Sequence, residues 1–199
     1  ESSPTSVGNL DWFIEQSYGR RIPEGKAVYE YCSQAVSGID PEENDLIFLP
    51  FLYGSNTAAP AKAGFFQISG HHTADHMLAA VYEGILFSLL QHIRILYGEH
   101  VPKTARFSGG ASRSPVWCQM AADILGFPIE VMDCTELGAM GAAICAGTAC
   151  GTWNDPADAV RHMCRIARTY LPNPERTGVY RKKYEQYQRA VRCLDTFYS

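Results

Sequence analysis

Residues 107–147 constrain the fold of this chain more than any other segment. An expected strand runs into Gly109 and Gly110, a helix follows, a second strand covers 128–132, and a helix rich in Gly and Ala occupies 137–149. Glycines let a ligand approach the main chain where a Cβ would block it, and a helix that begins just after them directs free N–H groups at that ligand. This arrangement is typical of α/β proteins that bind nucleotides, so we expect a nucleotide here.

The rest of the chain alternates strands and helices. Apolar runs at 46–52 and 64–68 predict strands, and apolar residues at helical spacing predict a long helix over 73–97. A second stripe on that helix consists of small residues around Gly84, which would let another element approach closely. Further helices are expected after Asp155. The order indicates an α/β domain with a largely parallel central sheet.

Composition excludes several classes of partner. The 199 residues carry a formal net charge of −4 without a dense Lys/Arg run, so nucleic acid and anionic membranes are poor candidates. The longest apolar helix pattern contains Glu83, His92 and Arg94, and no signal peptide is visible, so we expect no membrane span. The seven cysteines lack a Cys-x-x-Cys pair, and most fall in apolar patterns. We therefore expect buried free thiols in a cytoplasmic protein.

Aromatic and basic residues near the end of the chain have a simple structural interpretation. Tyr180, Tyr184 and Tyr187 share one helix face and are expected in the core, whereas residues 181–183 (Arg-Lys-Lys) are expected on a solvated face. A platform for stacking nucleic-acid bases would need aligned basic neighbours. Trp117, in the helix after the glycines, is likewise expected to pack in the core more than to stack on a base.

Four ordered blocks resemble the C-terminal part of the FGGY family of carbohydrate kinases, most closely the branch that phosphorylates pentuloses. Residues 50–57 (Pro-Phe-Leu-Tyr-Gly-Ser-Asn-Thr) are similar to the family's Pro-Tyr-Leu-x-Gly-Glu-Arg-Thr stretch. Residues 63–83 follow the family signature that ends in His-apolar-x-x-Ala-Val-Tyr-Glu. Residues 108–126 resemble the adenosine motif, and residues 136–147 resemble the helix at the hinge between the family's two domains.

The resemblance implies a ribonuclease H-like fold of the actin, hexokinase and Hsp70 type, in which two domains enclose a cleft. Residues 1–199 would form the C-terminal, ATP-side domain with extra C-terminal helices. The family's Gly-Thr-Ser hairpin at the start of this domain is not found, so the domain is expected to be incomplete. The N-terminal domain, which binds the sugar and carries the aspartate base, would be absent. No catalytic residue is therefore expected in this chain, and the chain alone is not expected to be catalytic.

By the same resemblance, nucleotide-binding residues fall on the glycine loop. Gly109 and Gly110 would let adenosine lie against the main chain, Ala111 would keep the floor of the site low, and Ser114 would offer a hydroxyl near the adenine or ribose. The alternative for this loop is an ordinary strand-to-helix turn with a serine N-cap. The small-residue helix that follows would pack at the hinge between domains or lie buried close to a sheet.

Gln67 is the main departure from the family pattern. It stands where the family has a glycine near the β- and γ-phosphates, so it would either donate its amide to a phosphate oxygen or obstruct the phosphate. The substitution favours a second hypothesis, in which this is a non-catalytic actin-like domain with a decayed nucleotide site, used for dimerisation or partner binding.

The histidines at 71, 72 and 76 raise a third hypothesis. His72 and His76 are four residues apart, as in zinc proteases, which would make the chain a zinc hydrolase. That motif requires glutamate directly after the first histidine, and Thr73 stands there. No third ligand is indicated, so we expect no metal site.

The sequence therefore favours the nucleotide-binding part of a carbohydrate kinase that acts on a ketopentose-type sugar. The expected cofactors are ATP and Mg²⁺, with the magnesium ion held mostly by groups outside this chain. The expected partners are ATP or ADP, and the sugar through the missing N-terminal domain. Family members are often dimers, so a homodimer is a further expectation.

Overall fold

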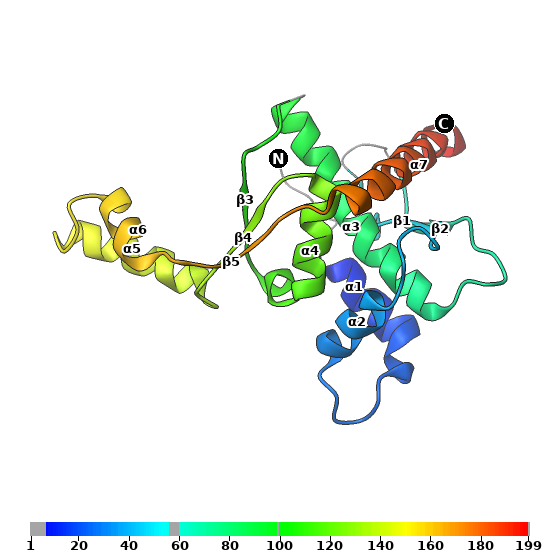
Figure 1. Ribbon diagram of the computed structural model, residues 1–199, viewed down its shortest axis with the longest axis horizontal. Coiled ribbons are helices and arrows are strands. Elements are labelled where there is room, and N and C mark those ends of the chain that lie inside the picture. The colour runs from blue at the N-terminus through cyan, green and yellow to red at the C-terminus, as the bar shows by residue number, and fades with distance from the viewer. Residues whose placement is uncertain (1–6, 56–59, 99, 199) are drawn as a thin grey trace.

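The computed structural model describes residues 7–55, 60–98 and 100–198, which Figure 1 traces in colour. The helical segments are α1 (Gly8–Phe13), the π-helix η1 (Ile14–Tyr18), the 3-10 helix η2 (Gly19–Arg21), α2 (Val28–Ser37), α3 (Ala74–Tyr97), the 3-10 helix η3 (Gly110–Arg113), α4 (Pro115–Leu125), α5 (Leu137–Ala149), α6 (Pro156–Met163) and α7 (Pro174–Tyr198). The strands are β1 (Ile47–Leu49), β2 (Gly64–Phe66), β3 (Ala105–Phe107), β4 (Ile129–Met132) and β5 (Ile166–Tyr170).

The described strands form two small sheets. β1 pairs antiparallel with β2, β3 pairs parallel with β4, and the other edge of β4 pairs antiparallel with β5. The expectation of a largely parallel sheet is therefore wrong, since β3–β4 is the one parallel pair in the described part of the chain. That pair arises because α4 carries the chain back to the start of β4, as a crossover between parallel strands requires. The alternation of strands and helices is confirmed.

The helix α3 forms the centre of the molecule. Thr73 and His76 form a capping box at its start, where His76 Nδ1 accepts a hydrogen bond from Thr73 N–H at 3.2 Å. The helix contacts β1, α1, α2, α4 and α7. Its buried residues include a continuous run from Leu78 to Ser88, as expected for a helix that is surrounded by other elements.

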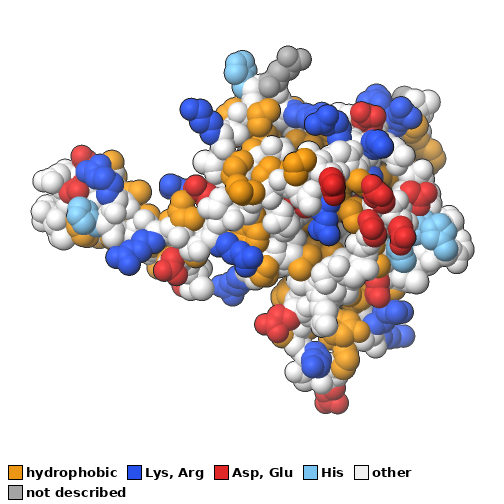
Figure 2. All heavy atoms as spheres, in the orientation of Figure 1, with side chains coloured by type: hydrophobic (Ala, Val, Ile, Leu, Met, Phe, Trp, Pro, Cys, Tyr) orange, Lys and Arg blue, Asp and Glu red, His pale blue; other side chains and the backbone are white. Residues whose placement is uncertain are grey.

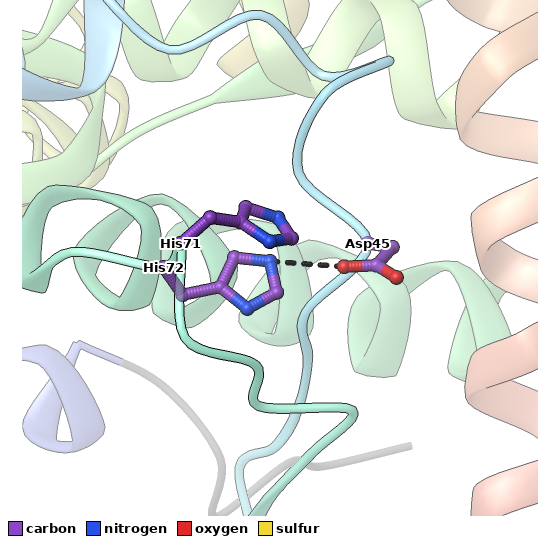
Figure 3. A group of neighbouring side chains, drawn as sticks. All are labelled: Asp45, His71 and His72. Carbon is purple, nitrogen blue, oxygen red and sulfur yellow. Dashed lines mark ion pairs between the residues drawn. The ribbon is translucent and has the colours of Figure 1, made fainter.

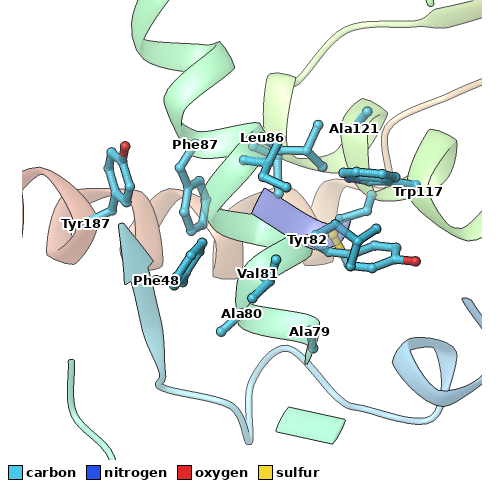
Figure 4. Close-up of a cluster of buried hydrophobic side chains, with 14 of the residues drawn as sticks. Phe48, Ala79, Ala80, Val81, Tyr82, Leu86, Phe87, Trp117, Ala121 and Tyr187 are labelled. Carbon is cyan, nitrogen blue, oxygen red and sulfur yellow. The ribbon is translucent and has the colours of Figure 1, made fainter. Parts of the chain in front are cut away.

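Figure 4 shows how this core is built. Tyr82, Leu86 and Phe87 project from α3, with Phe48 of β1 on one side and Trp117 of α4 on the other. By length and composition α3 could cross a bilayer, but 72% of its most apolar 18-residue window is buried inside the protein. The surrounding elements therefore account for its apolar character.

The C-terminal helix α7 is attached to this core by aromatic residues and one buried ion pair. Tyr180, Tyr184 and Tyr187 are buried, which confirms the expected core face. Lys183, expected on the solvated face, is instead buried and pairs with Glu83 of α3, whose side chain is 3% exposed. Burial raises the pKa of Glu83, and the charge of Lys183 acts in the opposite direction. That expectation for Lys183 is therefore wrong, because a partner on α3 offsets the desolvation of its ammonium group.

The helices α5 and α6 form an arm that projects away from the rest of the molecule, on the left of Figure 1. They pack on one another, and Gly147 of α5 lies so close to Trp153 that a Cβ would be 2.7 Å from its Nε1. Although α5 is apolar all round, Ile144 is its one buried residue. The sequence analysis offered two interpretations of α5, a helix buried close to a sheet and a helix at the hinge between domains. The first is wrong for the described residues, because nearly all of α5 is accessible. The hinge role stays a prediction.

All seven cysteines are free, but Cys32 and Cys118 are the only two that are fully buried. Burial raises the pKa of each of these two thiols to about 11, which keeps them protonated and unreactive at neutral pH. Cys145, Cys150 and Cys193 are exposed. The expectation of buried thiols is therefore wrong for most of them, because α5, which carries Cys145, has few neighbours in this chain.

Candidate nucleotide site

The loop between β3 and α4 has a conformation that requires glycine. Gly109 has φ 87° and ψ −169°, a region that is essentially restricted to glycine. Gly110 then begins η3, and Ser114 caps α4 with Pro115 in the first turn. The sequence interpretation assigned Gly109 to ligand approach alone, whereas the backbone itself also requires it.

The main chain at the glycine pair is open to its surroundings. Apart from the local main chain and the adjoining residues, no described atom lies within 4 Å of a Cβ built on Gly109 or on Gly110. By contrast, several other glycines in the chain are packed against neighbouring atoms, such as Gly84 against Phe48. A ligand therefore has room to lie against this stretch of main chain.

A cavity of about 560 Å³ lies beside the loop. Gly110, Ala111 and Ser114 line it, so the structure brings together three of the five predicted nucleotide-binding residues, with Gly109 directly adjacent in sequence. The remaining lining residues come mainly from the N-terminal helices and the core, and they are Val7, Leu10, Ala27, Val28, Tyr29, Glu30, Ser33, Tyr82, Arg113, Pro115 and Trp117. Cavities of this size that are lined mainly by apolar and aromatic groups are typical of small-molecule sites.

Ser114 has both structural and surface roles. Its Oγ accepts a hydrogen bond from Trp117 N–H at 3.1 Å, so the expected serine cap is confirmed. The same hydroxyl lies 2.8 Å from the hydroxyl of Ser33 on α2. Ser33 in turn is hydrogen-bonded to Tyr82. Burial raises the pKa of the Tyr82 phenol, and the hydrogen bond with Ser33 acts to lower it. Ser114 therefore ties α2, α3 and α4 together at the wall of the cavity.

Trp117 lies at the inner side of the same cavity. The residue is 3% exposed, and its ring packs against that of Tyr82, with the ring centroids 4.5 Å apart (Figure 4). This agrees with the expected packing role, although the residue also lines the cavity.

Gln67 is not among the residues that line this cavity. It follows β2 and has φ 67°, the one positive φ among the described non-glycine residues. Its Nε2 donates to the carbonyl oxygen of Asp45 at 2.8 Å and to Gln186 Oε1 at 3.4 Å. The backbone at Gln67 therefore has a conformation that glycine adopts readily. The Gln67 side chain is held by its hydrogen bonds to Asp45 and Gln186. A role at the phosphates stays a prediction.

The histidine cluster differs from the geometry of a zinc protease. The helix α3 begins at Ala74, so His72 precedes it and does not share a helix face with His76. His72 Nε2 lies 2.9 Å from Asp45 Oδ1, and His71 lies alongside (Figure 3). Asp45, His71 and His72 place three potential ligand atoms within 4.8 Å of one another. Ser69 is hydrogen-bonded to Nδ1 of both histidines, which limits their ability to bind a metal ion.

The hydrogen bonds of His72 fix its proton. Its Nδ1 accepts from Ser69 N–H at 3.0 Å, so in the neutral ring the proton is on Nε2, which lies 2.9 Å from Asp45 Oδ1. A metal ion at Nε2 would displace that proton onto Nδ1, against the N–H of Ser69. The third hypothesis, in which His72 and His76 bind zinc from one helix face, is therefore wrong, since His72 precedes the helix.

The sequence interpretation missed the residues that α2 contributes to the cavity, namely Val28, Tyr29, Glu30 and Ser33. Their periodicity predicts a helix but does not indicate that one side of it faces a cavity. Tyr29 is also fixed by a hydrogen bond from its hydroxyl to Asp11 Oδ1 at 2.8 Å. The position of α2 depends on tertiary contacts, so no local pattern could have identified these residues.

Solved structures identify the fold. The chain superposes on the xylulose kinase of Rhodospirillum rubrum with a TM-score of 0.82 at 24% identity, over 96% of this chain and 38% of that one. It superposes on the Plasmodium falciparum glycerol kinase with ADP with a TM-score of 0.74 at 19% identity, over 94% and 37%. The expected ribonuclease H-like α/β fold is thereby confirmed.

Sequence comparison identifies the family. A profile for the C-terminal domain of the FGGY family of carbohydrate kinases matches residues 6–150. The chain is 37% identical to the L-xylulose/3-keto-L-gulonate kinase of Escherichia coli (strain K12), over 100% of this chain and 39% of that protein. It is 36% identical to the probable L-xylulose kinase of Pasteurella multocida (strain Pm70), over 98% and 38%. The chain belongs to the FGGY family of carbohydrate kinases, and it spans less than two fifths of the length of these two relatives.

Proposed function

We propose that residues 1–199 are the ATP-side domain of a carbohydrate kinase, and that the parent chain transfers the γ-phosphate of ATP to a hydroxyl of a ketopentose-type sugar. The open main chain at Gly109 and Gly110, beside a largely apolar cavity of about 560 Å³, is the observation that supports the nucleotide assignment. In this proposal the adenosine occupies that cavity, with Ala111 and Ser114 at its wall.

The cavity fits the nucleoside better than it fits the metal. Tyr29, Tyr82 and Trp117 provide aromatic surface for a base. Glu30 is the one carboxylate that lines the cavity, and it is exposed on α2. Mg²⁺ prefers several oxygen ligands in octahedral geometry, so these residues do not form a magnesium site. Mg²⁺ would arrive with the nucleotide phosphates and be held by them and by groups outside this chain.

The sugar and the catalytic base are assigned to the part of the parent that precedes this chain. Several relatives are named as kinases of xylulose or L-xylulose, which supports a ketopentose as the acceptor. The exposed apolar helix α5 is suited to pack against the preceding domain and to serve as the hinge between the two. Location in the cytoplasm and assembly as a homodimer stay predictions.

A comparison of the parent chain with residues 1–199 tests this proposal. A coupled assay of ADP release, with Mg-ATP and a panel of ketopentoses, should show turnover by the parent and none by the 199-residue chain. Gly110→Trp should abolish turnover by the parent, whereas Gly178→Trp, at an exposed position on α7 with open space around it, should leave it intact. Absence of phosphoryl transfer to any sugar by the parent would contradict the proposal.

A further inference from the structure

We propose that the base-binding part of this cavity accepts 6-amino and 6-oxo purines alike, so that the phosphate donor class is purine nucleotides in general and not adenine nucleotides alone. This inference rests on the proposed nucleotide site. It concerns the polarity of the groups that a base edge would meet there.

The polar side chains that line the cavity fall into two groups. Glu30 and Arg113 are exposed, and the Arg113 side chain is 67% exposed and 3.6 Å from Glu136, so water competes for both charges. The hydroxyls of Ser33 and Ser114 lie deeper, and Ser33 is buried. Tyr82 adds a third buried hydroxyl, and Trp117 adds a buried Nε1–H for which the described residues offer no partner. That donor does not separate the two classes of base, because N3 and N7 accept hydrogen bonds in both. The other buried polar groups offered by side chains are hydroxyls.

These hydroxyls form a chain that can run in two directions. Tyr82 bonds Ser33, and Ser33 bonds Ser114 with either oxygen as the donor. Each hydroxyl has one proton and two acceptor positions. Ser114 already accepts from Trp117 N–H, which leaves it one further acceptor position and its own proton.

The direction of the chain decides what Ser114 presents to a ligand. When Ser114 donates to Ser33 and Ser33 donates to Tyr82, Ser114 keeps a free acceptor position. When Tyr82 donates to Ser33 and Ser33 donates to Ser114, the Ser114 proton is free to donate. Both arrangements retain the two internal hydrogen bonds, so the wall of the cavity can change polarity without losing either of them.

Adenine and hypoxanthine differ in this polarity. The 6-amino group of adenine donates and N1 accepts, whereas the 6-oxo group of hypoxanthine accepts and N1–H donates. A site rejects such an analogue strongly when the analogue leaves a buried group of fixed polarity unpaired. A hydroxyl chain that reverses leaves none unpaired, so discrimination between the two bases should be weak.

Titration of the 199-residue chain with ADP and with IDP tests the inference, because these nucleotides differ only in the base. We expect dissociation constants within about tenfold of each other, which is about 1.4 kcal/mol. A preference for ADP of more than tenfold would overturn the inference and leave the proposed function intact. Failure to bind either nucleotide would contradict the nucleotide site itself, and the inference with it.

A variant with fixed polarity tests the role of Ser114. In this proposal Ser114 faces the substituent at position 6 of the base. Ser114→Asp keeps an N-cap for α4 but only accepts hydrogen bonds at neutral pH, so it opposes the 6-oxo group and the ratio of IDP to ADP dissociation constants should rise by about tenfold. Ser112→Asp is the matched control, since Ser112 lies two residues away, bonds the Gly109 carbonyl oxygen at 2.7 Å and does not line the cavity. It adds the same charge and should leave the ratio unchanged. An unchanged ratio in a folded Ser114→Asp protein, as judged by its thermal midpoint, would overturn the inference.

Discussion

Gly84 in the middle of α3 packs directly against the main chain of Phe48 in β1. A Cβ on Gly84 would lie 3.1 Å from the carbonyl carbon of Phe48 and would overlap its carbonyl oxygen. The small-residue stripe in the sequence predicted a close approach of this kind, and the structure identifies β1 as the element that approaches.

Gly84→Ala should therefore destabilise the protein, although alanine is the better helix former by about 1 kcal/mol. Overpacking against a main-chain group should lower the free energy of unfolding by about 1–3 kcal/mol, as measured by urea denaturation. Gly141→Ala in α5 is the matched control, because that position has open space and should gain about 0.5–1 kcal/mol. Equal effects at both positions would contradict the close packing.

The buried pair of Glu83 and Lys183 should be sensitive to removal of one partner. Lys183→Met leaves a buried carboxylate without its counter-charge and should cost about 3–5 kcal/mol in the free energy of unfolding, whereas Glu83→Gln with Lys183→Met should recover part of that loss. Lys182→Met, on the exposed side of α7, should change stability by less than about 0.5 kcal/mol. A similar cost at both lysines would show that the pair is not formed.

The α5–α6 arm should loosen in acid. Asn154 N–H donates to Asp158 at 3.2 Å, and this hydrogen bond, together with Arg161 and His162, holds the pKa of Asp158 below the ordinary aspartate value of 3.8. A lowered pKa in the folded state means that the stabilisation is fully present above about 3.8 and is lost as the pH falls through the folded-state pKa. Amide exchange in α6, corrected for the intrinsic pH dependence, should therefore accelerate on acidification.

Asp158→Asn is the control for the acid effect on the arm. It should remove the acid dependence of exchange in α6 while the core helices keep theirs. The same acid dependence in this variant would show that another group titrates.

Gln67→Gly separates an intact nucleotide site from a decayed one. The change relieves a positive φ but removes the bond to the Asp45 carbonyl oxygen, so stability should change by less than about 1 kcal/mol. Because Gln67 does not line the cavity, the affinities of the 199-residue chain for adenosine and for ADP should stay within about threefold of their original values. If ADP bound more than about tenfold tighter to the variant, the hypothesis of a decayed site would be favoured instead.

The sequence predicted the parts of this fold that depend on local chemistry. Ser114 as an N-cap and the start of α3 at Thr73 both follow from short-range rules. The family resemblance placed the glycine loop, and the structure brought Gly110, Ala111 and Ser114 to one cavity.

The features that depend on long-range contacts were not predictable. β5 contains Arg168, directly follows Arg165 and is largely exposed, so its sequence lacks the apolar pattern of a strand. Its pairing with β4 makes it one. Lys183 resembled a solvated residue because its partner, Glu83, is far away in the sequence. The contribution of α2 to the cavity likewise results from how α2 packs against α3 and α4.

On the face shown in Figure 2, basic and acidic side chains of the described residues are interspersed, and they form no continuous basic stripe. Such a stripe is the usual electrostatic footprint of a nucleic-acid-binding protein.

Calorimetric titration of the 199-residue chain with ADP and Mg²⁺ tests the central claim most directly. The account predicts weak binding of ADP in the presence of Mg²⁺. Gly110→Trp should abolish this binding, because the indole would fill the open space over the main chain, and Gly178→Trp should leave it unchanged. Binding of ADP to a folded Gly110→Trp protein with unchanged affinity would contradict the assignment of the site.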